Sequence, residues 1–247
     1  MKLGEAKAGF TASLQQRRFE LNGVEDFEKV ITEVFALLES RFTDLAVEQI
    51  TPARLRDFLA RWYVEEASAK ILQPTPPSAS PVPQPSGRPE TTTLIKVLSA
   101  FFTWLRELSP DNFGEEHLAI LNELQKPLLR AVAINVALSR HLASCGGAVN
   151  FPEFLTSFEA GGHSEYDIGT GGAVGAIEGY FRILHIEGVK VEAEELLSEM
   201  RIYPIIFPTV VAELLQTGYL INLEIVHTSE AWQIVNCGFA YPPNTEI

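Results

Sequence analysis

Residues 50–63 read Ile-Thr-Pro-Ala-Arg-Leu-Arg-Asp-Phe-Leu-Ala-Arg-Trp-Tyr, and residues 93–105 read Thr-Leu-Ile-Lys-Val-Leu-Ser-Ala-Phe-Phe-Thr-Trp-Leu. Thr51 and Pro52 are the residue types that favour the N-cap and the first turn of a helix. Apolar residues then recur at the i, i+3, i+4, i+7 spacing of an amphipathic helix in both stretches. They are Leu55, Phe58, Leu59, Trp62 and Tyr63, then Leu94, Val97, Leu98, Phe101, Phe102 and Leu105. We therefore predict one helix over 50–72 and a second after a cap at 90–93, packed on each other or on a shared helix.

Further helical patterns flank this pair. Residues 26–42 place an apolar stripe on one face, and residues 115–144 read as a long helix with Pro127 as a boundary or kink. Residues 128–138 are apolar on nearly all sides, which is typical of the central helix of a bundle. A short helix is expected at 152–158.

Seven of the seventeen residues between Gln73 and Pro89 are proline. Such a segment cannot form a packed core, and we interpret it as an extended or mobile linker. It contains one PxxP match, at Pro74–Pro77, the pattern that aromatic-grooved recognition domains bind.

The hydrophobic period changes to two after a glycine-rich segment at 161–178. Alternating patterns predict short strands, with a helical turn at 208–216. The strands are expected at 180–186, 189–191, 201–207, 219–226 and 232–237. The predicted class is α+β: a helical bundle, then a small antiparallel β-barrel-like or rolled-sheet domain. The predicted organisation is an N-terminal arm (1–22), a helical domain (23–160) with the proline-rich insertion 73–89, a connection (161–178) and a β-rich domain (179–247).

The net charge of −13 is unevenly distributed, because residues 146–247 hold three basic and fourteen acidic side chains. Nucleic-acid binding depends on Lys and Arg neutralising phosphates. The C-terminal part is therefore a poor nucleic-acid surface, which leaves the N-terminal arm or the cluster Arg54, Arg56 and Arg61 for phosphate contacts.

No secretory signal is visible, and the longest apolar run, 128–138, is too short to cross a bilayer and contains Arg130 and Asn135. We therefore predict a cytoplasmic protein without a membrane partner. The two cysteines, Cys145 and Cys237, show no metal-ligand spacing and are expected to be reduced, although a disulfide between them stays open.

One cluster has the chemistry of a metal site. In an extended segment His163, Glu165 and Asp167 would share a face, and one imidazole with two carboxylates suits a divalent ion of Mn, Fe or Zn. The alternative interpretation is a solvated polar loop. Gly169–Gly175 lacks the βαβ setting of a dinucleotide fingerprint, and Ser164 lacks the second glycine of a nucleophile elbow. No catalytic residue is predicted, and no cofactor other than a divalent metal.

The two helical stretches, Ile50–Trp62 and Thr93–Leu105, resemble the helical N-terminal core-binding domain of tyrosine recombinases, whose helices clamp DNA. The resemblance covers about sixty residues and implies at most a shared helical arrangement. The catalytic domain of that family does not follow, and its Arg–His-x-x-Arg–Tyr set is missing. Strand exchange is not expected.

These observations favour a non-catalytic interaction, adaptor or regulatory protein that binds a protein partner. The alternatives are a metal-dependent enzyme using His163, Glu165 and Asp167, and a nucleic-acid-associated protein acting through the N-terminal helices. The sequence leaves open the ligand, the identity of any partner, the oligomeric state and the relative placement of the two parts.

Overall fold

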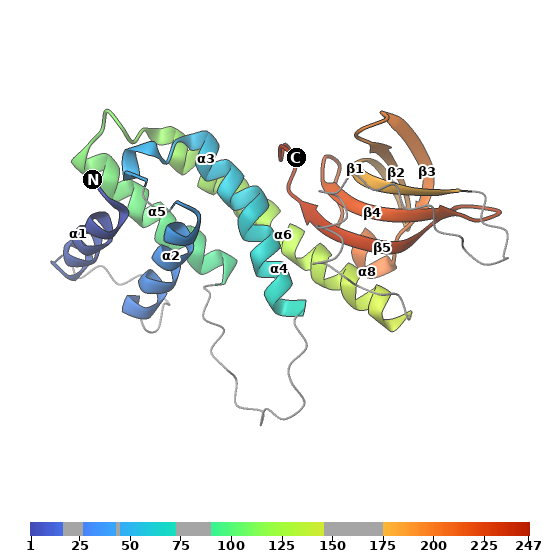
Figure 1. Ribbon diagram of the computed structural model, residues 1–247, viewed down its shortest axis with the longest axis horizontal. Helices are drawn as coiled ribbons and strands as arrows, with labels where there is room; N and C mark the ends of the chain where they lie inside the picture. The colour runs from blue at the N-terminus through green and yellow to red at the C-terminus, as the bar shows by residue number, and fades with distance from the viewer. Residues whose placement is uncertain (17–26, 43–44, 73–89, 146–174) are drawn as a thin grey trace, which may run out of the picture. The chain divides into compact units, whose positions relative to one another are not determined.

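The structure is a computed structural model that describes residues 1–16, 27–42, 45–72, 90–145 and 175–247 (Figure 1). The chain forms two compact units. The helical unit comprises Met1–Trp62 and Pro74–Leu129, and the second unit comprises Tyr63–Gln73 and Arg130–Ile247. Helices precede a five-stranded sheet along the chain, so the predicted mixture of helix and sheet is confirmed.

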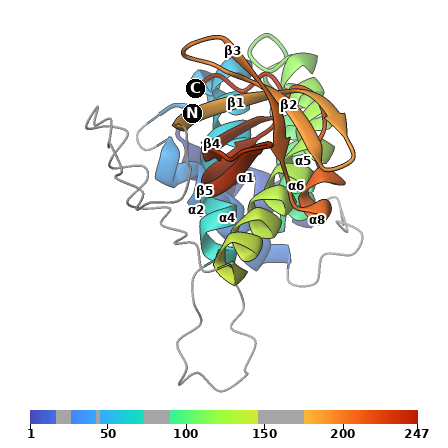
Figure 2. The same ribbon diagram turned by 90° about the vertical axis from the view of Figure 1, so that its right-hand side faces the viewer.

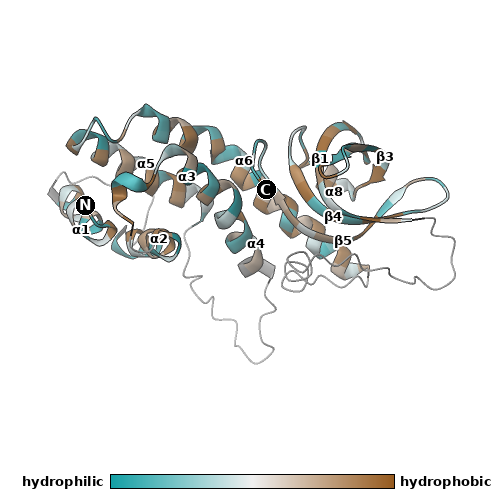
Figure 3. Ribbon diagram, turned by 45° about the horizontal axis from the view of Figure 1, so that its top comes forward, coloured by the Kyte–Doolittle hydropathy of each residue, from teal (hydrophilic) through white to brown (hydrophobic). Residues whose placement is uncertain are grey.

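The helical unit is built from segments that follow the predicted stripes closely. They are α1 (Leu3–Gln16), α2 (Phe27–Arg41), η1 (Val47–Gln49), α3 (Pro52–Asp57), the π-helical η2 (Phe58–Tyr63), α5 (Thr91–Leu108) and the first half of α6 (Glu115–Ser144). Thr51 caps α3, because its hydroxyl accepts a hydrogen bond from the Arg54 N–H at 3.3 Å. Figure 3 shows hydrophobic and hydrophilic segments alternating along α5 and α6, as amphipathic helices require.

Aromatic rings form the centre of this unit. Phe101 of α5 packs edge-on against Phe10 of α1 and Phe35 of α2, with ring centroids 5.4 and 4.9 Å apart. All three side chains are at most 1% exposed. Burying three aromatic side chains from three helices fixes those helices to one another.

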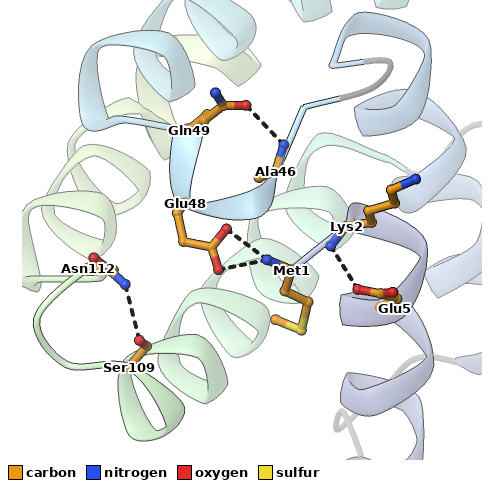
Figure 4. Close-up of polar contacts among 8 residues, drawn as sticks. All are labelled: Met1, Lys2, Glu5, Ala46, Glu48, Gln49, Ser109 and Asn112. Atoms are coloured by element: carbon orange, nitrogen blue, oxygen red, sulfur yellow. Dashed lines mark hydrogen bonds and ion pairs between the residues drawn. The ribbon is translucent and has the colours of Figure 1, made fainter.

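The N-terminal residues were predicted to be an arm, and the structure corrects this. Leu3, Ala6, Phe10 and Leu14 all lie on one face of α1 and are buried in the core. The chain start is also fixed, because the Met1 ammonium group lies 3.0 Å from both carboxylate oxygens of Glu48 (Figure 4).

Pro127 lies inside α6 and does not end it, so the helix runs from Glu115 to Ser144 as predicted. The second half of α6 was expected to be the central helix of a bundle. It belongs instead to the unit that contains the sheet. The second unit also includes α4 (Val64–Leu72), which continues from η2.

Within residues 175–247, the described C-terminal part of the second unit, the chain forms five strands and one helical turn (Figures 1 and 2). They are β1 (Ala176–Glu187), β2 (Lys190–Glu195), β3 (Met200–Ile206), α8 (Thr209–Ala212), β4 (Leu220–His227) and β5 (Trp232–Tyr241). The strand order is β1-β2-β3-β5-β4, and β4 pairs with β1, so the sheet closes on itself. β1 is long because its first half pairs with β4 and its second half with β2.

One pairing departs from the predicted antiparallel sheet. β3 and β5 run parallel, although only Ile205–Trp232 and Ile206–Gln233 are paired. The reason is the connection through α8. It returns the chain beside β1 as β4, and the following turn then sends β5 in the direction of β3.

Two helices of the same unit form hydrogen bonds with the C-terminal end of β5. Ala240 of β5 both donates to and accepts from the side-chain amide of Asn135 on α6, at 2.5 and 3.3 Å. The Tyr241 hydroxyl donates to Glu65 of α4 at 2.9 Å. The predicted domains and the compact units therefore differ for a physical reason: parts of two helices are bonded to the sheet.

Candidate functional site: a groove between three helices

A groove of about 380 Å³ lies between α1, α5 and α6 of the helical unit. Ligand pockets commonly have volumes between about 300 and 1,000 Å³. α5 supplies most of the lining, with residues from Ile95 to Glu107, and α1 and α6 supply the rest. All lining residues belong to the helical unit.

Aromatic and aliphatic side chains form one side of the groove. Phe10 and Leu14 of α1 are buried, and Trp104 of α5 is half-buried. The Trp104 ring lies 5.8 Å from the Phe10 ring, centroid to centroid. A Cβ on Gly9 would lie 3.1 Å from the Trp104 ring, so the absence of a side chain at Gly9 lets α1 approach this ring closely. The tryptophan is thereby held in place with part of its surface open.

The remaining lining is polar but mostly uncharged. Ser99 and Thr103 face the groove from α5, and the Thr103 hydroxyl donates to the Ser99 carbonyl at 2.8 Å. Asn122 and Gln125 line it from α6. Hydroxyl and amide groups beside an apolar surface are the usual means of orienting a bound molecule.

The part of α5 that lines the groove carries two opposite charges. Lys96 and Glu107, both exposed, are separated by about three turns of α5, or about 16 Å along the helix axis. The lining contains one amine, one carboxylate and neither histidine nor cysteine. This set suits recognition of an apolar surface with charges at its ends better than acid–base or nucleophilic chemistry.

The predicted metal ligands His163, Glu165 and Asp167 lie outside the described residues, as do Ser164 and the glycine-rich residues up to 174. In the described part of the chain no group of three His, Cys, Asp or Glu residues could hold a metal ion. The metal site therefore stays a prediction.

The arginine cluster proposed for phosphate contacts is engaged within the protein. Arg56 forms a two-point ion pair with Glu123 of α6, with N–O distances of 2.9 and 2.5 Å. Hydrogen bonds from Arg56 lower the pKa of Glu123. Arg54 donates to the Gln49 carbonyl at 3.2 Å. The charge of Arg56 is consequently neutralised in place, which weakens the case for this surface as a nucleic-acid contact.

A buried carboxylate that the sequence did not indicate lies at the end of β2. Glu195 is 6% exposed and accepts hydrogen bonds from the Leu197 and Ser198 N–H groups and from the Ser198 hydroxyl, at 3.0, 2.7 and 2.6 Å. Burial raises the pKa of Glu195, but these hydrogen bonds outweigh it and the pKa is lowered. Glu195 thus secures the β2–β3 turn.

Replacing Glu195 with glutamine is expected to reduce the stability of the protein at pH 7 by about 1–2 kcal/mol, because charge-assisted hydrogen bonds are lost. A carboxylate with a lowered folded-state pKa stabilises the fold above its unfolded pKa and loses this contribution as the pH falls through the folded pKa. The difference from wild type should therefore shrink below pH 4.5. Urea unfolding at pH 7 and at pH 3.5 measures the difference in unfolding free energy between wild type and Glu195→Gln, with Glu199→Gln as an exposed control. An equal difference at both pH values would contradict a stabilising role for the ionised Glu195 carboxylate.

The two cysteines are both free. Cys145 is exposed at the end of α6, whereas Cys237 of β5 is fully buried and burial raises the pKa of its thiol to about 12. We expect iodoacetamide at pH 8 to label Cys145 alone in the native protein and both thiols in urea, because the thiolate is the reactive form. Peptide mass spectrometry checks this; native labelling of Cys237 would show that β5 opens.

None of the helices in the described part of the chain is both long and apolar enough to span a bilayer. Comparison with known proteins finds no matching family model, no similar curated protein and no similar solved structure.

Proposed function

We propose that the protein is a non-catalytic interaction protein that binds a partner protein through the groove between α1, α5 and α6. The groove is the observation that carries the proposal. Its apolar side ends in a half-buried tryptophan, Trp104, a residue type that is enriched among the energetic centres of protein interfaces. Its polar groups are mainly neutral hydrogen-bonding groups, which supply orientation and specificity.

The charge of the second unit favours a protein partner over a nucleic acid. Five-stranded Greek-key barrels such as the OB fold bind oligonucleotides on the face of strands 2 and 3. In this protein the exposed or half-buried residues of β2 include Glu192 and Glu194, and Glu194 already pairs with Arg182 of β1 at 3.2 Å. β2 and β3 together carry Lys190 and Arg201 against Glu192, Glu194 and Glu195, so these strands offer no excess of basic groups for phosphates.

Affinity capture of the tagged full chain from its native cell lysate, with and without nuclease, tests the proposal. Ala100→Trp would fill the groove, and Ala36→Trp adds the same bulk at an exposed position on α2 outside it. We expect a nuclease-resistant, stoichiometric protein to be captured by wild type and Ala36→Trp and reduced at least tenfold for Ala100→Trp. Capture that nuclease abolishes would favour the nucleic-acid alternative. Failure to capture any protein would count against an interaction function.

A further inference from the structure

We infer that the protein contains a hinge, formed where two paired helices bend at the same level. One is the continuous run α3–η2–α4, which bends at η2 (Phe58–Tyr63), and the other is α6, which bends at Pro127. Bending at this level lets the two compact units change their orientation. The inference does not depend on the groove between α1, α5 and α6.

Three hydrogen bonds show how the two helices run past each other. They join His117 to Ile50, Glu123 to Arg56, and Asn135 to Ser68, at 2.9, 2.9 and 2.8 Å. The partners are 67 residues apart in each pair, so the two helices run in the same direction with a constant offset. With this offset, Pro127 of α6 lies level with Ala60, in the middle of η2.

Regular helical hydrogen bonding is interrupted in both helices at this level. Pro127 has no N–H group to donate to the Glu123 carbonyl, and a proline ring crowds that carbonyl. In η2 the π-helical bonds span five residues instead of four. Sharp bends in helices occur at prolines and at π-helical segments. Because π-helices form well under 1% of protein structure, one that lies level with a proline in the paired helix singles out this position.

The two irregular segments coincide with the boundary between the compact units. This boundary falls between Trp62 and Tyr63 on the first helix, and between Leu129 and Arg130 on α6. Each lies within three residues of a π-helical residue or of Pro127. Movement between the units therefore has to pass through the positions at which both helices bend most easily.

Hydrogen bonds on either side of this level keep the two helices together. The Arg56–Glu123 ion pair joins them within the helical unit. The Asn135 amide joins them within the second unit, where it also bonds to β5. Because the helices are joined both before and after the irregular segments, neither can bend without the other.

Double electron–electron resonance between two nitroxide labels tests the hinge in the full chain. The labels replace Glu116 and Arg140, which are exposed on α6 on either side of Pro127. A straight helix would hold the two positions about 36 Å apart along its axis. We expect a broad distance distribution in the otherwise native chain, and a distribution about twofold narrower or more in Pro127→Ala, which restores the missing N–H. Lys126→Ala, at the neighbouring exposed position, should leave the width unchanged.

All variants carry Cys145→Ser, so that the exposed native thiol takes no label, whereas Cys237 is buried. Pro127→Ala is expected to fold, since alanine is favoured over proline inside a helix.

A second label pair tests whether the two helices bend together. The labels replace Ala53 of α3 and Ala67 of α4, on either side of η2. Pro127→Ala lies on the other helix, yet it should narrow this distribution as well. Narrow wild-type distributions that Pro127→Ala leaves unchanged would overturn the hinge. Narrowing between positions 116 and 140 alone would overturn the joint bending of the two helices.

Discussion

The Phe101→Ala variant is expected to lose about 3–5 kcal/mol of unfolding free energy, the usual cost of removing a buried phenylalanine ring. Phe101 is fully buried, and its ring contacts those of Phe10, Phe35 and Phe102, with centroids 4.9–5.5 Å apart. The change would leave a cavity where α1, α2 and α5 meet. The neighbouring rings belong to three different helices, so they cannot collapse into the space without moving the helices.

Urea denaturation followed by tryptophan fluorescence measures this loss, since Trp62 and Trp104 both lie in the helical unit. Leu108→Ala is a matched control on the same helix, because Leu108 is 60% exposed and should change stability by less than about 0.5 kcal/mol. The loss of unfolding free energy for Phe101→Leu should lie between those for Leu108→Ala and Phe101→Ala. A loss below about 1 kcal/mol for Phe101→Ala would mean that the aromatic cluster does not hold α1 and α5 together.

The sequence predicts those elements whose signal is local. The apolar stripe of residues 94–105 becomes the buried face of α5, and Thr51-Pro52 marks the start of α3. The predicted bounds 115–144 agree with α6, because the helical pattern continues on both sides of Pro127. Period-two patterns likewise locate all five strands of the sheet within a few residues.

Elements whose signal depends on distant residues could not be predicted in this way. α1 has a thin stripe that includes Ala6, and the role of Gly9 becomes clear only from its contact with Trp104. In the sheet, the role of Gly238 is likewise clear only from a distant residue, because β5 bulges there opposite Asn222 of β4. A Cβ on Gly238 would overlap the Asn222 side chain, and no local pattern relates these two positions.

The groove was not predicted because three segments that are distant in sequence line it. One local signal exists. Lys96, Ser99, Thr103 and Glu107 form a second stripe on α5, beside the buried one, and Trp104 lies at its border. A tryptophan at the edge of a polar stripe indicates a partly exposed aromatic surface, although it does not say which helices stand beside it.

Asn135→Leu is expected to destabilise the second unit by about 2–4 kcal/mol. Asn135 is 1% exposed, and its side-chain amide bonds to the Ala240 N–H, the Ala240 carbonyl and the Ser68 hydroxyl. Leucine has a similar volume and would leave the two backbone groups of Ala240 buried without partners, at about 1–3 kcal/mol each before relaxation. Asn135 is the one polar residue in the run 131–138, and it is the residue that joins α6 to β5.

Urea denaturation of the full chain measures this loss, and Asn122→Leu is the matched control, because it makes the same change at an exposed position of the same helix. Ser68→Ala removes only one of the three partners and should cost about 1 kcal/mol. The double variant of Ser68→Ala and Asn135→Leu should cost less than the sum of the two single changes, because both remove the same hydrogen bond. If the losses of unfolding free energy in the double variant are additive, Asn135 acts through packing alone. If Asn122→Leu and Asn135→Leu lose equal amounts, the hydrogen bonds between α6 and β5 contribute nothing to the stability of this unit.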